Sequence, residues 1–339
     1  MGRTYLFLVI TLLVCFLADL VIGSVWIRPS IVLDIISGQT EGLEIEKNII
    51  INYRFPRAVS ALFAGMGLSI SGLLMQTLFR NPLAGPFVLG ISSGASLGVA
   101  LVVLGGFGIT GYLSFTESGH WATILGAILG ASLVFLVILA FSNHVRDVTS
   151  LLIIGLMFSS VTSAFVSVLQ YFSNPENVKA FLIWTFGDLG SVTTDELWIM
   201  VPILVVALLS SILLIKPLNI LQLGEMYASN SGLNIKRTRY GIIMITAMLA
   251  GTITAFCGPI AFVGLAVPHI ARMMLNKADH GAILPVCALI GAGVLLICDI
   301  LSRAPGFSQT LPLNAITSLF GGPLVIWLIV KRKNLQSYF

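Results

Sequence analysis

The stretch from Asn81 to Thr116, NPLAGPFVLGISSGASLGVALVVLGGFGITGYLSFT, contains no charged residue. A water-facing segment of this length would carry charges, because about 25% of the residues in soluble domains are charged. The whole chain has the same character, since 57% of its 339 residues are hydrophobic and 9% are charged. No single aqueous core could bury that much apolar surface, so lipid must solvate much of it. The composition therefore predicts an all-α, polytopic membrane protein.

Ten apolar segments have the length of a transmembrane helix. A hydrocarbon core about 30 Å thick needs about 20 residues at a rise of 1.5 Å per residue. The predicted spans are residues 5–27, 57–79, 86–107, 121–141, 149–172, 196–215, 239–257, 260–275, 282–301 and 312–330. The Gly258-Pro259 pair before the short eighth span predicts a tight turn or a re-entrant segment there. We expect a single transmembrane domain over residues 1–339.

The N-terminus has two features of a signal peptide, because Arg3 precedes the apolar stretch Tyr5–Ala18. The apolar run continues to Trp26, however, and no small-x-small cleavage site precedes its end. We therefore expect a first span that is retained in the mature protein.

Lysine and arginine residues are unevenly distributed over the connections between the spans. With a cytoplasmic N-terminus, six of the 18 face outward and the other twelve face the cytoplasm. The six are Arg28, Lys47, Arg54, Arg57, Lys179 and Arg303. Because cytoplasmic loops carry an excess of these residues, we predict that both termini lie in the cytoplasm.

Small residues recur at four-residue intervals in two of the spans, at Gly90, Gly94 and Gly98 and again at Gly126 and Gly130. Helices in lipid associate through close backbone approach, which small residues permit. We interpret both runs as contacts within one helix bundle rather than as a dedicated dimer face.

Metal and nucleotide chemistry are not predicted for this chain. The four cysteines lie in apolar runs without C-x-x-C spacing, so we expect neither a metal site nor a disulfide framework. The sequence has no G-x-x-x-x-G-K-[ST] phosphate-binding loop, so we do not expect the chain to hydrolyse ATP or to be an enzyme.

Buried acids and histidines are few. Asp19 is the one acid deep in a span, and we expect it to meet a neighbouring helix or interfacial water. His269 has no second ligand at helical spacing, so it is predicted to be a structural cap rather than a haem or metal ligand. His144 and His280 lie in short cytoplasmic connections and are predicted to be solvated.

Three short blocks occur in a fixed order along the chain. They are Arg54-Phe-Pro-Arg57, Arg80-Asn-Pro-Leu-Ala84 and Phe262-Val-Gly-Leu265 followed by Pro268-His-Ile-Ala-Arg272. In these blocks, over about residues 50–331, the chain resembles the FecCD-type permeases. These are the membrane subunits of ATP-binding-cassette importers for ferric siderophores, haem and vitamin B12. The resemblance implies the type II importer permease fold with ten spans, which is the number counted above.

The resemblance also implies partners. A second permease subunit, identical or paralogous, would complete the pathway. Two cytoplasmic ATPase subunits would hold the ATP and Mg²⁺, so no cofactor is expected on this chain, and a periplasmic or lipid-anchored protein would deliver the cargo. No nucleic acid is expected. The implied function is import of an iron–siderophore across the inner membrane by alternating access, with haem or vitamin B12 as the alternative cargo.

The outer arginines have a role in the family that carries over to Arg54, Arg57 and Arg303. The resemblance implies that they bind acidic residues of the cargo-binding protein. A guanidinium suits this role because its rigid fork pairs bidentately with carboxylates. The alternative is that these residues anchor lipid headgroups or pair within the chain with Asp299 and Glu46. The proline between the first two permits either a loop or the first turn of a helix.

The longest cytoplasmic connection, residues 216–240, resembles the coupling helices that seat in the ATPase subunits. A short helix is plausible there, with Met226, Ala228 and Leu233 as an apolar contact and Gly232 as a left-handed cap. The alternative is an ordinary connector. The residues assigned to coupling are Leu223, Gly224, Glu225, Ala228, Ser229 and Gly232.

The translocation pathway in the family runs along the fifth and tenth spans. The polar residues assigned to it here are Ser159, Ser160, Ser163, Ser167 and Gln170, and Asn314 and Ser318. The alternative for each hydroxyl is a hydrogen bond to the carbonyl four residues before it. None of these residues is charged, so we expect no charge-paired pocket inside the membrane.

One motif departs from the family pattern. Where the family has Glu-Leu-Pro-x-Gly before the tenth span, this chain reads Thr310-Leu-Pro-Leu-Asn314. The role of that acid is therefore not carried over. Two rival classes fit less well: an ion-coupled transporter needs paired intramembrane charges or matching broken helices, and a haem-binding redox subunit needs facing histidines.

Overall fold

The computed structural model describes residues 2–23, 25–38, 42–105, 117–145, 148–303 and 310–331. In these ranges every regular element is a helix, and no strand occurs. Three of the predicted cytoplasmic charges, Arg146, Arg332 and Lys333, lie outside the described residues, as does the predicted end of the third span at residues 106–107.

The described helices follow one another in a simple order. They are α1 (Gly2–Val21), α2 (Pro29–Ile36), α3 (Glu44–Ile49), the π-helical turn η1 (Ile50–Arg54), α4 (Phe55–Leu78), the short η2 (Pro86–Leu89), α5 (Ile91–Val103), α7 (Glu117–His144), α8 (Val148–Phe172), α9 (Pro175–Thr185), α10 (Thr194–Leu213), α11 (Ile215–Gln222), α12 (Glu225–Asn230), α13 (Ile235–Cys257), α14 (Val263–Leu275), α15 (His280–Ser302) and α16 (Leu313–Lys331).

Each predicted span corresponds to one helix. Among the described residues, seven helical stretches are long and apolar enough to cross a membrane, and three shorter apolar helices fall at the positions of the third, eighth and tenth spans. The predicted boundaries were wrong at three places. The first span ends at Val21 rather than at residue 27, and the second helix begins at Glu44 rather than at residue 57. The third helix begins at Ile91 rather than at residue 86, because Pro86–Leu89 form the separate turn η2.

The second span is one continuous helical stretch from Glu44 to Leu78, made of α3, η1 and α4. Its 35 residues correspond to about 52 Å at 1.5 Å per residue, well beyond the ~30 Å hydrocarbon core. Pro56 does not interrupt it. A proline lacks an N–H and clashes with the preceding turn, and here the turn widens so that the Phe55 N–H donates to the carbonyl of Ile50, five residues back. Arg54 and Arg57 therefore lie on a helix, not in a loop.

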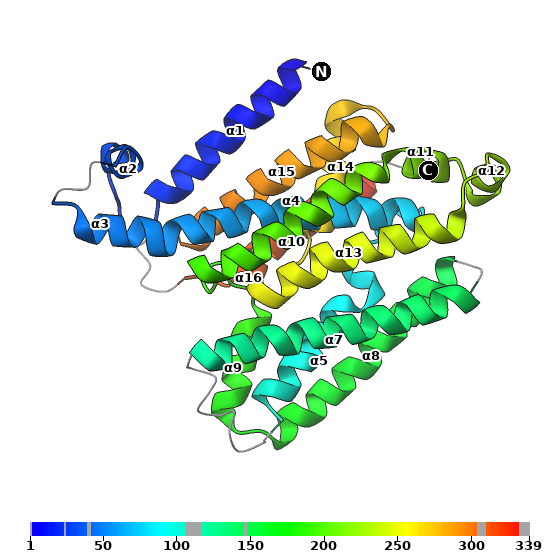
Figure 1. Cartoon of the computed structure of the whole chain (residues 1–339), viewed down its shortest axis with the longest axis horizontal. Coiled ribbons are helices and arrows are strands. Elements are labelled where there is room, and N and C mark those ends of the chain that lie inside the picture. The colour runs from blue at the N-terminus through cyan, green and yellow to red at the C-terminus, as the bar shows by residue number, and fades with distance from the viewer. Residues whose placement is uncertain are drawn as a thin grey trace.

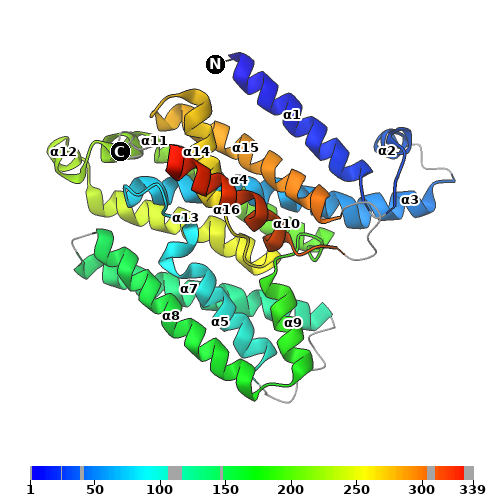
Figure 2. The same ribbon diagram turned by 180° about the vertical axis from the view of Figure 1, so that it is seen from behind.

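The helices form two groups that lie side by side (Figures 1 and 2). In one group α4 is central and contacts α13, α14 and α15, with α1 on the outside against α15. In the other group α5 contacts α7 and α8. The hairpin of α11 and α12 lies at one end of the bundle, and α2 and α3 lie at the opposite end.

Within each group, close backbone contacts between glycines hold neighbouring helices together. A side chain on Gly98 would place its Cβ 1.9 Å from the Gly126 carbonyl oxygen, and one on Gly94 would lie 2.5 Å from that of Gly130. The predicted use of these runs for packing within one bundle is confirmed. In the same way Gly65 of α4 faces Gly291 of α15, where an added Cβ would lie 2.3 Å from the Gly65 carbonyl oxygen.

Two substitutions in α15 test this close contact. We expect Gly291→Ala to destabilise the protein by about 1–3 kcal/mol, as overpacking does, because the obstructing atom belongs to the backbone of α4. Gly293→Ala is the matched control, since nothing lies within 4 Å of its added Cβ. It should gain up to about 1 kcal/mol from helix propensity. Unfolding of the purified variants in mixed micelles measures both. Equal effects at the two positions would contradict the contact.

Candidate functional site

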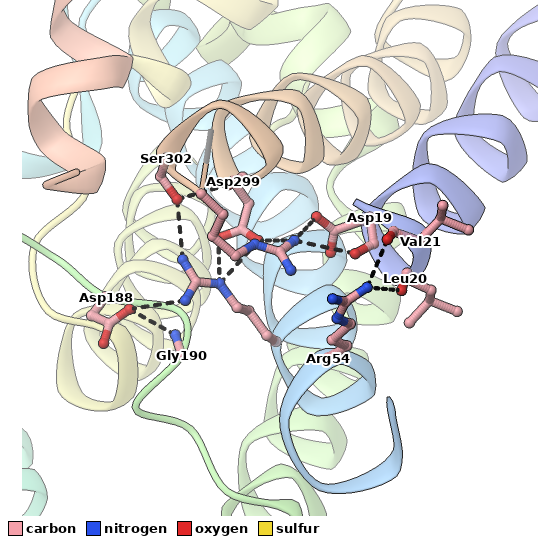
Figure 3. Close-up of polar contacts among 10 residues, drawn as sticks. Asp19, Leu20, Val21, Arg54, Asp188, Gly190, Asp299 and Ser302 are labelled. Atoms are coloured by element: carbon pink, nitrogen blue, oxygen red, sulfur yellow. Dashed lines mark hydrogen bonds and ion pairs between the residues drawn. The ribbon is translucent and has the colours of Figure 1, made fainter. Parts of the chain in front are cut away.

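Charged side chains gather at the end of the bundle that carries α2 and α3 (Figure 3). They come from helices that are distant in the sequence: Asp19 on α1, Arg54 on η1, Arg57 on α4, Asp188 after α9, Asp299 on α15 and Arg303 just after α15. We call these six residues the outer charge cluster. Its three carboxylates balance its three guanidinium groups.

Asp299 is the centre of the outer charge cluster. It is fully buried, and its two carboxylate oxygens lie 2.8 and 3.0 Å from Nε of Arg57. Nη2 of Arg303 lies 2.7 Å from the same carboxylate. Ser302 completes the arrangement, because its hydroxyl accepts from Arg57 at 3.1 Å and donates to the Asp299 carbonyl at 2.7 Å. One carboxylate thus contacts two cations at the C-terminal end of α15, and Asp188 and Asp19 supply the remaining negative charges.

Asp19 joins the first helix to this centre. Its carboxylate pairs with Arg303, which also donates to the Asp19 backbone carbonyl at 3.3 Å. Asp19 is fully buried. The expectation that this acid meets a neighbouring helix is confirmed, because its partner Arg303 lies at the C-terminal end of α15.

Arg54 does not take part in an ion pair of the cluster. Its Nη1 donates to the carbonyls of Leu20 and Val21 at 2.7 Å each, and its Nη2 donates to that of Val25. Carbonyls at a helix C-terminus lack partners in the helix and carry partial negative charge, so a cation there is stabilising. Arg54 therefore caps the end of α1. Gly23 makes room for it, because a Cβ there would lie 2.9 Å from the guanidinium.

For the three outer arginines the structure therefore favours the alternative interpretation, in which they bind groups of this chain. Arg57 and Arg303 pair within the chain, with Asp299 rather than Glu46 as the shared partner. Arg54 and Arg303 are only 5% and 9% exposed. Docking of a partner protein to these three residues stays a prediction.

Asp188 connects the cluster to the second group of helices. Its Oδ1 lies 3.8 Å from Nη1 of Arg57 and accepts the Gly190 N–H at 2.8 Å. It also lines a cavity of about 240 Å³ between α7, α9 and α13, together with His120 and Trp184. His120 pairs there with Glu196 of α10 at 2.9 Å. Sequence reasoning did not assign Asp188 a role.

The opposite end of the bundle carries the predicted coupling segment. Residues Glu225–Asn230 form α12, so the predicted short helix is confirmed. The predicted cap is also confirmed: Gly232 has φ +80°, the Leu233 N–H donates to the Ala228 carbonyl at 3.0 Å, and the Gly232 N–H donates to that of Ser229 at 3.0 Å. This is a Schellman motif. Gly224, with φ +110°, forms the turn between α11 and α12.

The exposed face of this hairpin agrees only in part with the predicted one. Met226 is exposed, as predicted, whereas Ala228 is fully buried, so its place in an apolar contact surface is wrong, and Leu233 is half-buried. Three large apolar side chains are exposed, with Leu223 at 63%, Met226 at 82% and Tyr227 at 56%. We call these three residues the apolar tip. Of the other assigned residues, Ser229 is exposed.

Glu225 holds the hairpin on the bundle. Its Oε1 lies 3.2 Å from Nη2 of Arg239 on α13, and Arg239 also donates to the Val145 carbonyl at 3.3 Å. Glu225 is thus placed to orient α12 against α13.

The polar residues assigned to the pathway lie on α8 and α16. On α8, the hydroxyls of Ser159, Ser160 and Ser167 donate to the carbonyls four residues before them, at 3.0, 3.1 and 2.9 Å. The alternative expectation for these hydroxyls is therefore the one observed. Ser160, Ser163 and Ser167 are nonetheless on the exposed side of α8, whereas Gln170 and Ser318 are half-buried.

Asn314 uses its side chain as a structural link at the start of α16. Its Nδ2 donates to the carbonyls of Thr185 and Pro259, the first at 3.0 Å and the second at 2.6 Å. Its Oδ1 accepts the Ala261 N–H at 2.9 Å. With the amide occupied on both sides, Asn314 ties α16 to α9 and to the Gly258-Pro259 turn rather than presenting free polar groups to a pathway.

Two histidines, His269 and His280, are both in contact with other elements. His269 lies 2.7 Å from the Pro82 carbonyl, in accord with its predicted structural role. The prediction that His280 is solvated was wrong, because it is 2% exposed and lies between Thr77 of α4 and Asn219 of α11. The side chain of His144 is outside the described residues.

A bundle of apolar helices with polar clusters at its two ends defines a polytopic membrane protein, and comparison with known proteins identifies it as a permease of the ATP-binding-cassette importers. The family model described as the FecCD transport family matches residues 11–331. The chain belongs to this family. Its members are transport permeases, so the chain is a transport subunit rather than an enzyme.

Relatives match over nearly the whole chain. The vitamin B12 import system permease protein BtuC of Klebsiella pneumoniae is 35% identical over 98% of this chain and 95% of its own length. The hemin transport system permease protein HmuU of Yersinia pestis is 35% identical over 86% of this chain and 85% of its own length. A solved structure, described as an inward-facing conformation of a putative metal-chelate type ABC transporter, has a TM-score of 0.84 and 27% identity, covering 98% of this chain and 100% of that one.

Proposed function

We propose that this chain forms the membrane pathway of an ATP-driven importer for a metal chelate, with a ferric siderophore as the leading cargo and haem or vitamin B12 as the alternatives. The observation that carries the proposal is the end-to-end likeness to permeases named for vitamin B12 and hemin and to a metal-chelate type transporter. These cargoes share a metal held by an organic chelator. A ferric siderophore belongs to the same chemical class.

The surface chemistry of α8 supports a pathway that binds its cargo weakly. The exposed side of this helix carries hydroxyls and apolar side chains, and from Val148 to Phe172 it has no charged residue. Hydroxyls that already donate to their own helix have no donor left for a cargo and can only accept hydrogen bonds from it. Such a wall lets a large chelate pass without being held, and high affinity then belongs to a separate cargo-binding protein.

The partners follow from the same proposal. A second permease subunit would face α8 and α16 across the pathway. Two ATPase subunits would bind at the cytoplasmic end, where α11 and α12 lie, and a cargo-binding protein would dock over the outer charge cluster. The chain would lie in the inner membrane with both termini in the cytoplasm, which puts α12 on the ATPase side and α3 outside.

Uptake by intact cells tests the cargo. Cells with and without this chain are given ferric siderophore, haem and cyanocobalamin, each radiolabelled and in a separate arm. We expect accumulation of one of the three that depends on the chain and stops when its ATPase partner is deleted. Accumulation of none of them would overturn the metal-chelate proposal, and accumulation that survives loss of the ATPase would favour an ion-coupled transporter.

A further inference from the structure

Helices α4 and α15 are joined along most of their length by contacts that leave little room for sliding. Gly65 and Gly291 meet backbone to backbone, and the Ser69 hydroxyl of α4 donates to the Cys287 carbonyl of α15 at 2.9 Å. The ion pair of Arg57 with Asp299 lies toward one end of this pair of helices. Relative sliding would break a buried hydrogen bond and a buried ion pair, both of which are costly to leave unmade.

The cytoplasmic end of the pair is fastened to α11 by one side chain. Oδ1 of Asn219 accepts the backbone N–H of His280 at 2.8 Å and lies 2.7 Å from its Nδ1. Nδ2 of Asn219 donates to Asp279, the residue just before α15, at 2.6 Å. The first N–H groups of a helix have no partner within it. Asn219 of α11 therefore caps the start of α15 from outside.

His280 extends this link to α4. Its Nε2 lies 2.8 Å from the hydroxyl of Thr77, near the cytoplasmic end of α4. His280 and Thr77 are 2% and 1% exposed, so water does not compete for the contact. The chain of contacts Asn219–His280–Thr77 thus ties α11 to both α15 and α4.

The outer end of the same pair is fastened to two other segments. Arg303 follows α15 and pairs with Asp19 of α1, and Arg57 of α4 lies 3.8 Å from Asp188 after α9. The α4–α15 pair therefore has polar links at both ends. One end lies beside the hairpin of α11 and α12, and the other lies within the outer charge cluster (Figures 1 and 3).

We propose that α4 and α15 move as one rigid strut between the two faces of the protein, and that Asn219 is the positioning residue through which α11 moves the strut. This inference rests on the proposed function, in which partners bind at both faces. A partner that displaces α11 pulls on the start of α15 through Asn219, and His280 carries the displacement to α4. At the outer end Asp299 transmits it to Arg57 and Arg303, and so to α1 and the α9–α10 connection.

The test uses the complete transporter, reconstituted in vesicles with its ATPase subunits and its cargo-binding protein. We expect Asn219→Ala to leave the basal ATPase rate unchanged and to reduce the stimulation of that rate by the binding protein about tenfold. A residue that merely stabilised the fold would lower both rates together. Asn230→Ala is the matched control, because Asn230 is an exposed asparagine at the end of α12, and it should behave as the unchanged protein.

A second pair of variants decides the matter if Asn219→Ala does not assemble. Thr77→Val keeps the shape of the side chain and removes the hydroxyl, so it should lower the stimulation several-fold, and Thr77→Ser should restore it. Normal stimulation in Asn219→Ala, or in Thr77→Val, would overturn the strut while leaving the proposed function intact. Failure of the unchanged transporter to respond to nucleotide would instead count against the proposed function.

Discussion

Asp299→Asn should lower the free energy of unfolding by about 3–5 kcal/mol, the cost of removing one partner from a buried ion pair. The asparagine has the size of the aspartate but no charge. It would leave the guanidinium groups of Arg57 and Arg303 beside a neutral amide in a fully buried position. The loss should be large because this one carboxylate contacts both cations and is fully buried.

Unfolding of the purified subunit in mixed micelles measures the effect, with Asp195→Asn as the control. Asp195 is an exposed carboxylate in the first turn of α10, and its replacement should change stability by less than about 0.5 kcal/mol, as is usual for surface positions. A double variant that also carries Arg57→Gln should be less destabilised than the sum of the single variants, because it removes one of the cations that lost Asp299 as a partner. Strict additivity, or a stable Asp299→Asn protein, would contradict the arrangement of the outer charge cluster.

Met226→Glu should abolish transport while leaving the subunit folded. Met226 is 82% exposed at the apolar tip, so the substitution places a charge in water in the isolated chain. In the proposed assembly the same charge would be buried against the ATPase. An unpaired buried charge costs several kcal/mol, which is enough to prevent association at ordinary concentrations.

Co-purification of the ATPase with the tagged permease measures this association, and cargo uptake is measured in the same cells. Asn230→Glu, an exposed residue on the same short helix, is the control and should retain both. Retention of the ATPase by Met226→Glu would show that the apolar tip is not the contact surface. Arg239→Gln is expected to act differently, since loss of its pair with Glu225 would misplace α12 without altering the tip.

Composition and length were sufficient to predict the spans, because a lipid-exposed helix must be apolar over about 20 residues. They could not predict where the helices extend into polar sequence. The first turns of the second helix contain the charged residues Glu44, Glu46 and Lys47. The proline at residue 56 also favoured a prediction that the helix begins at residue 57. The π-helical turn η1 accommodates that proline, and a hydropathy pattern does not reveal such a turn.

Several residues of the outer charge cluster could be predicted from the sequence, but most of their contacts could not. The blocks that carry Arg54 and Arg57 were found, and the four-residue spacing of Asp299 and Arg303 was an available sign of their pairing. The pairing of Asp19 with Arg303 joins residues 284 positions apart, so no local pattern could reveal it. Ala228 and His280 were misplaced for a related reason, because burial in short connections depends on which helices pack over them.

We propose that this chain lines an uncharged pathway, while specificity and energy come from proteins bound at its two faces. Transport by the purified chain in proteoliposomes, with and without the ATPase and the cargo-binding protein, tests it most directly. We predict that radiolabelled cargo accumulates against its gradient only when both partners and ATP are present. Accumulation by the chain alone, without nucleotide, would contradict the claim.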